Sequence, residues 1–183
     1  LGELREWQEK DSAPLIPAEI TYLKMGLSHT AGLCNWYSHW LEVRQRIEAR
    51  NNTAFQWIAV AYADWKLAKA ISPQDVLTAA IESRSAGLLI DTYSKQGQNL
   101  LDSLSLDELK ALIEQARSHK LKIALAGSID SKTLTSLAEV SPDIIGIRGA
   151  ACLGKVRTNG LQEQAVRKFR TQLDRQFALT ESG

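Results

Sequence analysis

Apolar stretches of strand length alternate with amphipathic stretches of helix length along nearly the whole chain. Each strand-like stretch is a nearly continuous apolar run, which is typical of strands that are buried on both faces of a parallel sheet. The strand-like stretches are 20–27, 55–64, 86–93, 121–128 and 143–151, and the helix-like ones are 34–50, 74–84, 106–119, 131–140 and 160–178. This alternation predicts an α/β protein with a parallel sheet covered by helices.

Two of the predicted helices begin at recognisable capping residues. Ser72 is followed by Pro73, an N-cap residue and a proline at the first helical position. Ser105 is followed three residues later by Glu108, which is the spacing of a capping box. Both signals fix where a strand-to-helix loop ends.

The pattern alone is compatible with a doubly wound sheet or a (β/α)8 barrel. A dinucleotide-binding doubly wound sheet would need a G-x-G-x-x-G turn after its first strand, and the sequence has none. Small or functional residues follow every strand-like stretch, as in barrel enzymes, which place their chemistry at the carboxyl ends of strands. These observations favour a TIM barrel.

The count of strands is short of a closed barrel. Five strands are found, with a remnant at 1–4, whereas a barrel needs eight strands and about 250 residues. Either the sheet is open, or about two βα units are absent, and the second interpretation is preferred. We therefore expect residues 1–183 to form a single (β/α)8 barrel domain that is N-terminally truncated, with its first two βα units missing.

The charge balance excludes several classes of function. The 183 residues contain 22 Lys and Arg against 21 Asp and Glu, with no dense basic stripe, which argues against a nucleic-acid partner. No apolar run reaches the roughly 18 residues of a transmembrane helix, so a membrane partner is not expected. Cys34 and Cys152 lie far apart without metal-binding spacing. We expect a cytoplasmic protein without a metal ion.

Lys24 is the first candidate catalytic residue, because it interrupts an apolar run near the end of the stretch 20–27. A strand lysine commonly extends its ammonium group into solvent. In a barrel, however, Lys24 shares a face with Tyr22 and Gly26 and would point inward. Partial burial lowers the pKa of a lysine, which suits it to act as a base or to form an imine.

Asp91 and Lys95 form a second candidate pair, at the end of the stretch 86–93. The pair is either a salt bridge that fixes the loop or a carboxylate–ammonium pair that holds an anionic substrate and moves protons. Asp64 ends the stretch 55–64 and is either catalytic, orienting or a helix cap.

The last two strand ends are candidates for phosphate binding. In barrels, the loops after the seventh and eighth strands commonly hold a phosphate on backbone N–H groups and a helix N-terminus. The alternative is that the glycines only permit tight turns and that the arginine forms a structural ion pair. The residues concerned are Gly127, Ser128, Arg148, Gly149 and Ala150.

The histidines have no metal-ligand spacing. His39 and His119 fall within or at the end of predicted helices and are expected to be structural. His29 follows the Lys24 stretch and is the histidine considered for a site role. Trp36, Trp40 and Trp57 are expected in the core.

Taken together, the motifs resemble those of the (5-formylfuran-3-yl)methyl phosphate synthase family, the 4-HFC-P synthases of methanofuran biosynthesis. The resemblance extends over nearly the whole chain from about residue 20, in the family's order and approximate spacing. It is carried by "YLKMGL", "AYAD", "LLIDTYSKQGQNLLD", "KIALAGSI" and "DIIGIRGAAC".

The resemblance implies a (β/α)8 barrel lyase without metal or organic cofactor. Such an enzyme condenses two glyceraldehyde 3-phosphate molecules into a phosphorylated furan aldehyde, releasing phosphate and water. By this resemblance Lys24 matches the proton acceptor, Asp91 and Lys95 match an active-site pair, and the "AGSI" and "GIRGAA" segments match the phosphate side.

The chain departs from the family at one important point. The family's first strand carries a "D-x-K-N-P-x-x-G-S-L-G"-like segment with the imine-forming lysine, and no such segment occurs here. The alternatives are therefore a non-catalytic phosphosugar-binding barrel or assembly partner, and a class I aldolase-like enzyme with Lys24 as nucleophile. We expect the exposed sheet edges to pair with another copy or with a separate N-terminal segment.

Overall fold

The computed structural model describes residues 1–8, 10, 12–94, 98–156 and 158–180. Its centre is a five-stranded, all-parallel sheet in the order β1-β2-β3-β4-β5, so that every strand pairs with the next one along the chain. The strands are β1 (Tyr22–Lys24), β2 (Gln56–Tyr62), β3 (Gly87–Asp91), β4 (Lys122–Leu125) and β5 (Ile144–Ile145). This sequential order is that of a barrel wall and not of a doubly wound sheet, whose strand order reverses.

The helices follow the strands as the sequence pattern predicts. The α-helices are α1 (Trp36–Asn51), α2 (Pro73–Glu82), α3 (Leu100–Ser103), α4 (Leu106–Ser118), α5 (Ser131–Ala138) and α6 (Glu163–Thr180). The 3₁₀ turns are η1 (Leu4–Trp7), η2 (Gly149–Ala151) and η3 (Leu153–Lys155). Ser72 caps α2 by accepting the N–H of Asp75, and Ser105 forms the predicted capping box with Glu108.

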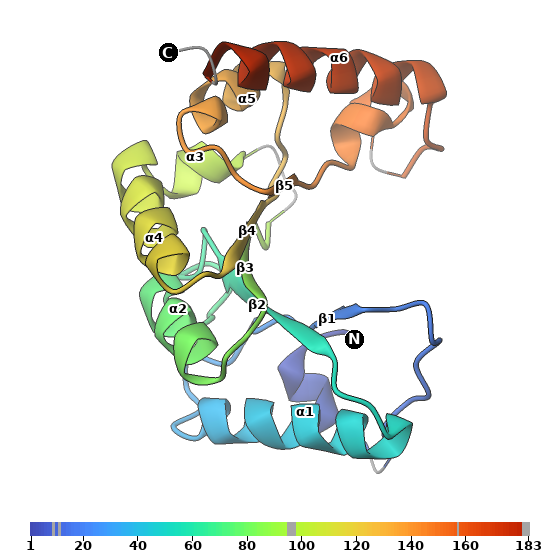
Figure 1. The fold of residues 1–183 in the computed structure, drawn as a ribbon, viewed down its shortest axis with the longest axis vertical. Coiled ribbons are helices and arrows are strands. Elements are labelled where there is room, and N and C mark those ends of the chain that lie inside the picture. Colours follow the sequence, from blue (N-terminus) through green and yellow to red (C-terminus); the bar gives the residue numbers. More distant parts are fainter. Residues whose placement is uncertain (9, 11, 95–97, 157, 181–183) are drawn as a thin grey trace.

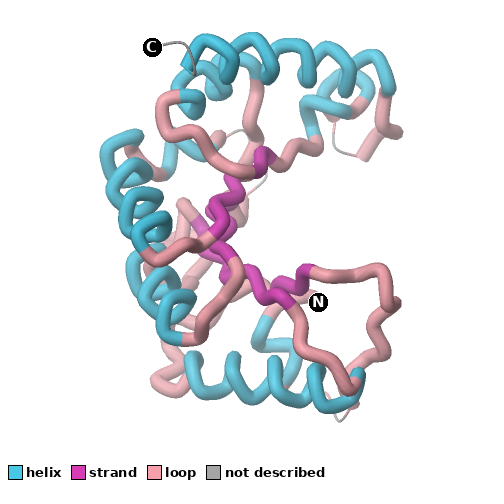
Figure 2. Tube along the Cα trace, in the orientation of Figure 1, coloured by secondary structure: helices cyan, strands magenta, loops and turns pink. Residues whose placement is uncertain are grey.

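The prediction of an N-terminally truncated (β/α)8 barrel is wrong in its fold class, because the described residues form a half-barrel sheet and no barrel. The strands form an arc with the helices on its outer side, and β1 and β5 do not meet (Figure 1). In the Cα trace the molecule has the outline of a C, with the strands along its inner side (Figure 2). The structure is therefore an open, curved half-barrel sheet, because five strands with this curvature do not return to the first one.

The remnant predicted at residues 1–4 extends the sheet by a single bridge. Glu3 pairs with Gly26 in the parallel sense, through the N–H of Leu4 to the carbonyl of Gly26 (2.8 Å) and the N–H of Gly26 to the carbonyl of Gly2 (2.9 Å). This bridge lies just beyond the last residue of β1.

Alternation along the strands separates two layers. Side chains such as Leu23, Trp57, Leu88 and Ile123 are buried in the large core between the sheet and the helices. The opposite, concave face carries a smaller buried cluster of Val60, Tyr62, Ala68, Ala70 and Leu89. Trp40 and Trp57 are core residues, as expected, while Trp36 packs partly buried at its margin.

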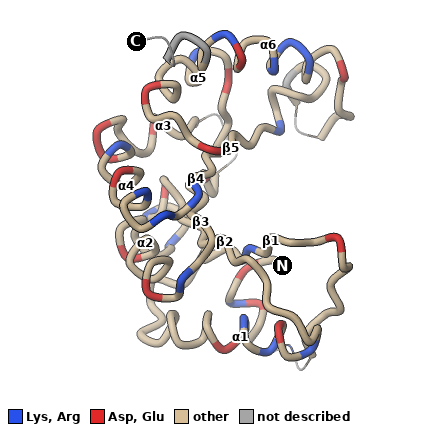
Figure 3. The backbone as a smooth tube through the Cα atoms, viewed as in Figure 1, with Lys and Arg blue, Asp and Glu red and all other residues tan. Residues whose placement is uncertain are grey.

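Basic and acidic residues are interspersed along the helices (Figure 3). No helix in the described part of the chain is long and apolar enough to cross a membrane.

Candidate functional site

The carboxyl ends of parallel strands lie at the same edge of a sheet, so the residues that follow the strands are gathered there. Lys24 is the last residue of β1 and Asp91 the last residue of β3. Asp64, Gly127 and Arg148 follow β2, β4 and β5 by two or three residues. The sequence-predicted candidates among the described residues therefore share the rim formed by the ends of the strands, with Lys24 set back along the sheet, level with the first residue of β3.

Lys24 is exposed on the concave face. The burial of β1 alternates, with Leu23 in the helix-facing core and Tyr22 and Lys24 on the other side. This is the face that the alternation in the sequence predicted for Lys24. Lys24 is in register with Ile58 of β2.

Lys24 and Asp91 lie on strands that are separated by β2. Asp91 is in register with Tyr62, which is four residues beyond the Ile58 partner of Lys24. In a flat sheet this offset is about 13 Å along the strand and about 10 Å across it. A small molecule would have to lie between these two side chains for both to act on it.

Asp91 is half-buried, and its Oδ1 accepts the N–H of Thr92 at 2.8 Å. This local bond orients one carboxylate oxygen at the end of β3. Its predicted partner Lys95 lies outside the described residues, so the Asp91–Lys95 pair stays a prediction.

Asp64 holds the loop after β3. Its Oδ1 accepts the N–H of Tyr93 at 2.7 Å, and its Oδ2 accepts the N–H of Ser94 at 2.8 Å. Of the three roles considered for Asp64, the orienting one matches these contacts, because both carboxylate oxygens receive backbone donors from the neighbouring loop.

Glu3 and Tyr62 form a part of the rim that the sequence did not indicate. The Tyr62 hydroxyl donates to Glu3 Oε1 at 2.9 Å, and the N–H of Ser28 donates to Glu3 Oε2 at 2.7 Å. A Cβ at Gly26 would meet the Glu3 carboxylate, so a side chain at position 26 would have to displace this carboxylate. Burial raises the pKa of the Tyr62 phenol, and the nearby Glu3 carboxylate raises it further, so Tyr62 remains a donor.

Aromatic side chains continue this contact toward the next loop. The Tyr62 and Tyr93 rings meet edge to face at 5.7 Å, and the Tyr93 and His29 rings do so at 5.9 Å. The Tyr93 hydroxyl and His29 Nε2 are 3.3 Å apart. The loops after β1, β2 and β3 are thus joined by side chains. In the sequence, these side-chain contacts are indicated only by Tyr62 and Asp64, which are two residues apart and so share a face at the end of one strand.

Gly127 and Ser128 form the turn after β4. Gly127 has φ +108° and Ser128 has φ 52°, and a Cβ at Gly127 would lie 2.8 Å from Thr92 Cγ2. The N-terminus of α5 is occupied by Asp130, whose carboxylate accepts the N–H groups of Lys132 and Thr133. The part of the phosphate prediction that invoked a helix N-terminus therefore does not fit α5, because a carboxylate already caps it.

Arg148, Gly149 and Ala150 follow β5, where the backbone turns into η2. Arg148 is exposed, and its carbonyl accepts the N–H of Ala151 at 3.0 Å. Arg148 follows the end of β5 as the Gly127 turn follows the end of β4, and phosphate binding by these residues stays a prediction.

The histidines expected to be structural lie in helices or at their ends. His39 is within α1, 3.8 Å from Glu42, and His119 is the C-cap residue of α4. Within the described ranges, no three His, Cys, Asp or Glu side chains come together in a way that could hold a metal ion.

These features define an α/β protein of parallel strands whose charged and polar groups lie at the carboxyl ends of the strands. The chain belongs to the 4-HFC-P synthase family, whose model matches residues 1–170.

Curated relatives agree with this assignment. The chain is 33% identical over 156 residues to the (5-formylfuran-3-yl)methyl phosphate synthase of Methanothermobacter thermautotrophicus, covering 84% of this chain and 64% of the relative. It is 33% identical over 144 residues to the synthase of the same name from Methanobrevibacter smithii, covering 76% of this chain and 58% of the relative. It is 36% identical over 141 residues to that of Methanocaldococcus jannaschii, covering 76% and 59%. The chain thus spans less than two thirds of the length of these relatives.

Proposed function

We propose that this chain acts in the synthesis of (5-formylfuran-3-yl)methyl phosphate from two molecules of glyceraldehyde 3-phosphate, as a lyase of methanofuran biosynthesis that needs no metal or organic cofactor. The observation that carries the proposal is the family match over residues 1–170, which includes Lys24 and Asp91. Both residues end strands and lie on one rim of the sheet. The partner is a phosphorylated carbonyl compound.

Lys24 is the proton acceptor in this proposal. Its ammonium group is exposed on the concave face, where it can reach a substrate that lies across the strand ends. Proton transfer requires hydrogen-bonding reach to the reacting atom, and a lysine at the end of a strand has that reach through its flexible stem. A substrate between Lys24 and Asp91 would have one cationic and one anionic group available for proton movement.

Asp64 acts on the same reaction through the loop that it holds. By accepting the N–H groups of Tyr93 and Ser94, it fixes the segment that leads from Asp91 toward Lys95. It is therefore a positioning residue in this proposal. The turn of Gly127 and Ser128, with Arg148, Gly149 and Ala150, receives one phosphate group.

By the family resemblance, the lysine that forms the imine belongs to a segment that these 183 residues do not contain. Trapping experiments can therefore separate the roles. The segment of the Methanothermobacter relative that has no counterpart here would be joined to the amino end of this chain. The joined protein would then be incubated with glyceraldehyde 3-phosphate, with and without borohydride.

We expect a furan aldehyde absorbance from the joined protein, and a borohydride adduct that peptide mapping places in the added segment. The variant Lys24→Met should retain the adduct and lose turnover. An adduct on Lys24 itself would instead indicate an aldolase-like enzyme. Absence of both adduct and furan would reject the proposal and leave a phosphosugar-binding protein.

A further inference from the structure

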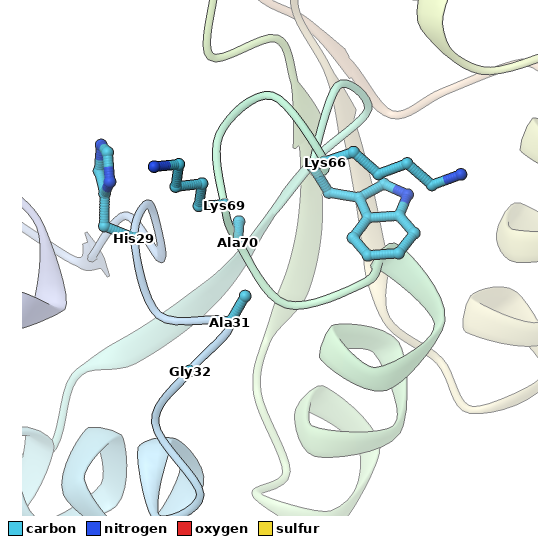
Figure 4. A pocket seen from close by; sticks show the side chains of 7 residues that line it. His29, Ala31, Gly32, Lys66, Lys69 and Ala70 are labelled. Carbon is cyan, nitrogen blue, oxygen red and sulfur yellow. The ribbon is translucent and has the colours of Figure 1, made fainter.

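A pocket lined by basic side chains lies between the loop after β1 and the loop after β2, apart from the predicted phosphate site at the ends of β4 and β5. It is a pocket of about 480 Å³, lined by His29, Ala31, Gly32, Trp65, Lys66, Lys69 and Ala70 (Figure 4). His29 and Lys69 come from different loops, and their side chains extend to the same side (Figure 4). Every titratable side chain that lines the pocket is a histidine or a lysine.

The two loops are held together by their backbones. The N–H of His29 donates to the carbonyl of Ala68, and the N–H of Ala31 donates to the carbonyl of Lys69, both at 2.9 Å. His29 and Lys69 have φ values of 58° and 49°, in the left-handed region. The relative position of the two residues is therefore set by the backbone, and binding would not need to order either loop.

Lys69 occupies a position that favours glycine. The N–H of Lys69 bonds to the carbonyl of Lys66 and the N–H of Ala70 to that of Trp65, the pattern of a Schellman turn. A residue with a Cβ in this conformation costs about 1–2 kcal/mol relative to the right-handed region. Glycine would suit this backbone conformation better, so a glycine variant at position 69 can remove the ammonium group without straining the turn.

His29 is oriented by Tyr93. Its Nε2 lies 3.3 Å from the Tyr93 hydroxyl, and the two rings pack edge to face. When this hydroxyl donates to Nε2, the imidazole proton is on Nδ1 and provides an N–H donor. Lys66, by contrast, has its ammonium 5.4 Å from the Trp65 ring centre and extends away from His29 and Lys69 in Figure 4. His29 and Lys69 are therefore the pair that faces a ligand.

The pocket is separate from the Gly127 turn. Thr92 packs against Gly127, while the next residue, Tyr93, contacts His29. The segment Thr92–Tyr93 therefore lies between the two places. The proposed reaction brings together two phosphorylated molecules, and two phosphate dianions at one position would repel each other strongly. Two cationic places on either side of one loop avoid that repulsion.

We infer that the His29–Lys69 pocket binds the phosphate group of one of the two phosphorylated carbonyl substrates, while the strand ends of β4 and β5 receive the other. For the identity of the ligand, this inference rests on the proposed function. Binding itself can be measured without turnover, so the two ideas can fail separately.

The test is a titration of this chain with glycerol 3-phosphate, which carries the phosphate monoester but no carbonyl, followed by calorimetry, with glycerol as the negative probe. We expect saturable binding of glycerol 3-phosphate and none of glycerol. The chain should bind two molecules of glycerol 3-phosphate, and Lys69→Gly should weaken one of the two binding events at least about tenfold, because a charge-assisted hydrogen bond is lost. The variant should fold at least as well as the parent, because glycine suits the conformation.

The matched control is Lys120→Gly. Lys120 also has a left-handed backbone, with φ 61°, but it follows α4 at the opposite, amino-terminal edge of the sheet. It should change affinity by less than about twofold, since the charge lost is remote and screened. His29→Asn keeps a residue that tolerates the left-handed region and should weaken binding several-fold. This variant decides the matter if Lys69→Gly does not fold.

Equal affinity in Lys69→Gly and Lys120→Gly would overturn the inference, as would the lack of saturable binding by the parent chain. If Arg148→Gln alone abolishes binding, the inference also fails, since a single site at β5 then accounts for it. Furan synthesis by the joined protein together with normal binding in Lys69→Gly would leave the proposed function standing and reject the pocket. Weaker binding in Lys69→Gly, together with no furan synthesis by the joined protein, would support the pocket and reject the proposed function.

Discussion

The carboxyl ends of β1, β2 and β3 are joined by side chains, whereas those of β4 and β5 are shaped by the backbone. In the first region, Glu3 binds Tyr62, and Asp64 binds the amides of Tyr93 and Ser94. In the second region the turns depend on Gly127 with φ +108° and on the short η2 turn. One region presents charged and aromatic groups in fixed positions, and the other presents small residues.

This difference assigns different tasks to the two regions. Proton transfer needs a titratable group held near the reacting atom. Phosphate binding needs backbone N–H groups and close approach, which small residues allow. We therefore expect removal of Lys24 to affect turnover, and changes at the Gly127 turn to affect binding and folding.

The largest effect is expected from Lys24→Met in the joined protein. Removal of a general acid or base lowers the rate by about 10²–10⁴-fold. The control is Lys122→Met, since Lys122 begins β4 at the opposite edge of the sheet and is also exposed. Turnover would be followed by furan absorbance. A loss of equal size in both variants would show that the effect is not specific to the strand end.

Gly127→Ala should give the largest loss of stability. The new Cβ would lie 2.8 Å from Thr92 Cγ2 and 3.1 Å from the Thr92 backbone nitrogen, in a backbone conformation with φ +108°. Strain and overpacking together should lower the free energy of unfolding by about 2–4 kcal/mol. Gly160→Ala is the matched control, because nothing lies within 4 Å of a Cβ there. Urea denaturation of both variants measures the difference, and equal midpoints would contradict the close approach.

Asp64→Ala should lower the free energy of unfolding by about 1–3 kcal/mol, because two backbone donors lose a charged acceptor. Asp107→Ala removes an exposed carboxylate from the first turn of α4 and should cost under about 1 kcal/mol. Hydrogen exchange gives a direct readout: the amides of Tyr93 and Ser94 should exchange faster only in Asp64→Ala. Unchanged protection of both amides would remove the positioning role of Asp64.

The order of elements could be predicted from the sequence because each strand is an apolar run and two helices carry caps at Ser72 and Ser105. The lengths of the strands could not be predicted in the same way. The stretches 20–27 and 143–151 contain strands of only three and two residues, β1 and β5. β1 and β5 are the edge strands, and each forms a continuous hydrogen-bonded ladder with one neighbour only. The apolar stretch in the sequence is therefore longer than the segment that pairs as a strand.

The sequence pattern also could not predict whether the sheet closes into a barrel or which side chains contact one another. Periodicity indicates a parallel sheet covered by helices but does not say whether the first and last strands meet. The bond between Glu3 and Tyr62 joins residues that are 59 positions apart, and neither residue is unusual in its local sequence. Lys24 could be named as a candidate from the sequence, because a charged residue inside an apolar run is a local signal.

The smallest effect expected is that of Tyr62→Phe. At pH 8 the variant should be less stable by about 1 kcal/mol, because Glu3 loses a hydrogen-bond donor. The pKa of Tyr62 is raised in the folded protein by burial and by Glu3, so above pH 10 the unfolded chain releases this proton while the folded one retains it. Folding stability in the parent protein should therefore fall as the pH rises past 10. Tyr62→Phe lacks this contribution, so the difference in free energy of unfolding between parent and variant should narrow between pH 8 and about 10.5.

The control is Tyr22→Phe, at an exposed tyrosine of β1, which should show neither effect in the same urea denaturation series. A gap that stays constant with pH would mean that Tyr62 does not bind Glu3 as a buried donor, and the side-chain link between the first strands would lose its central contact.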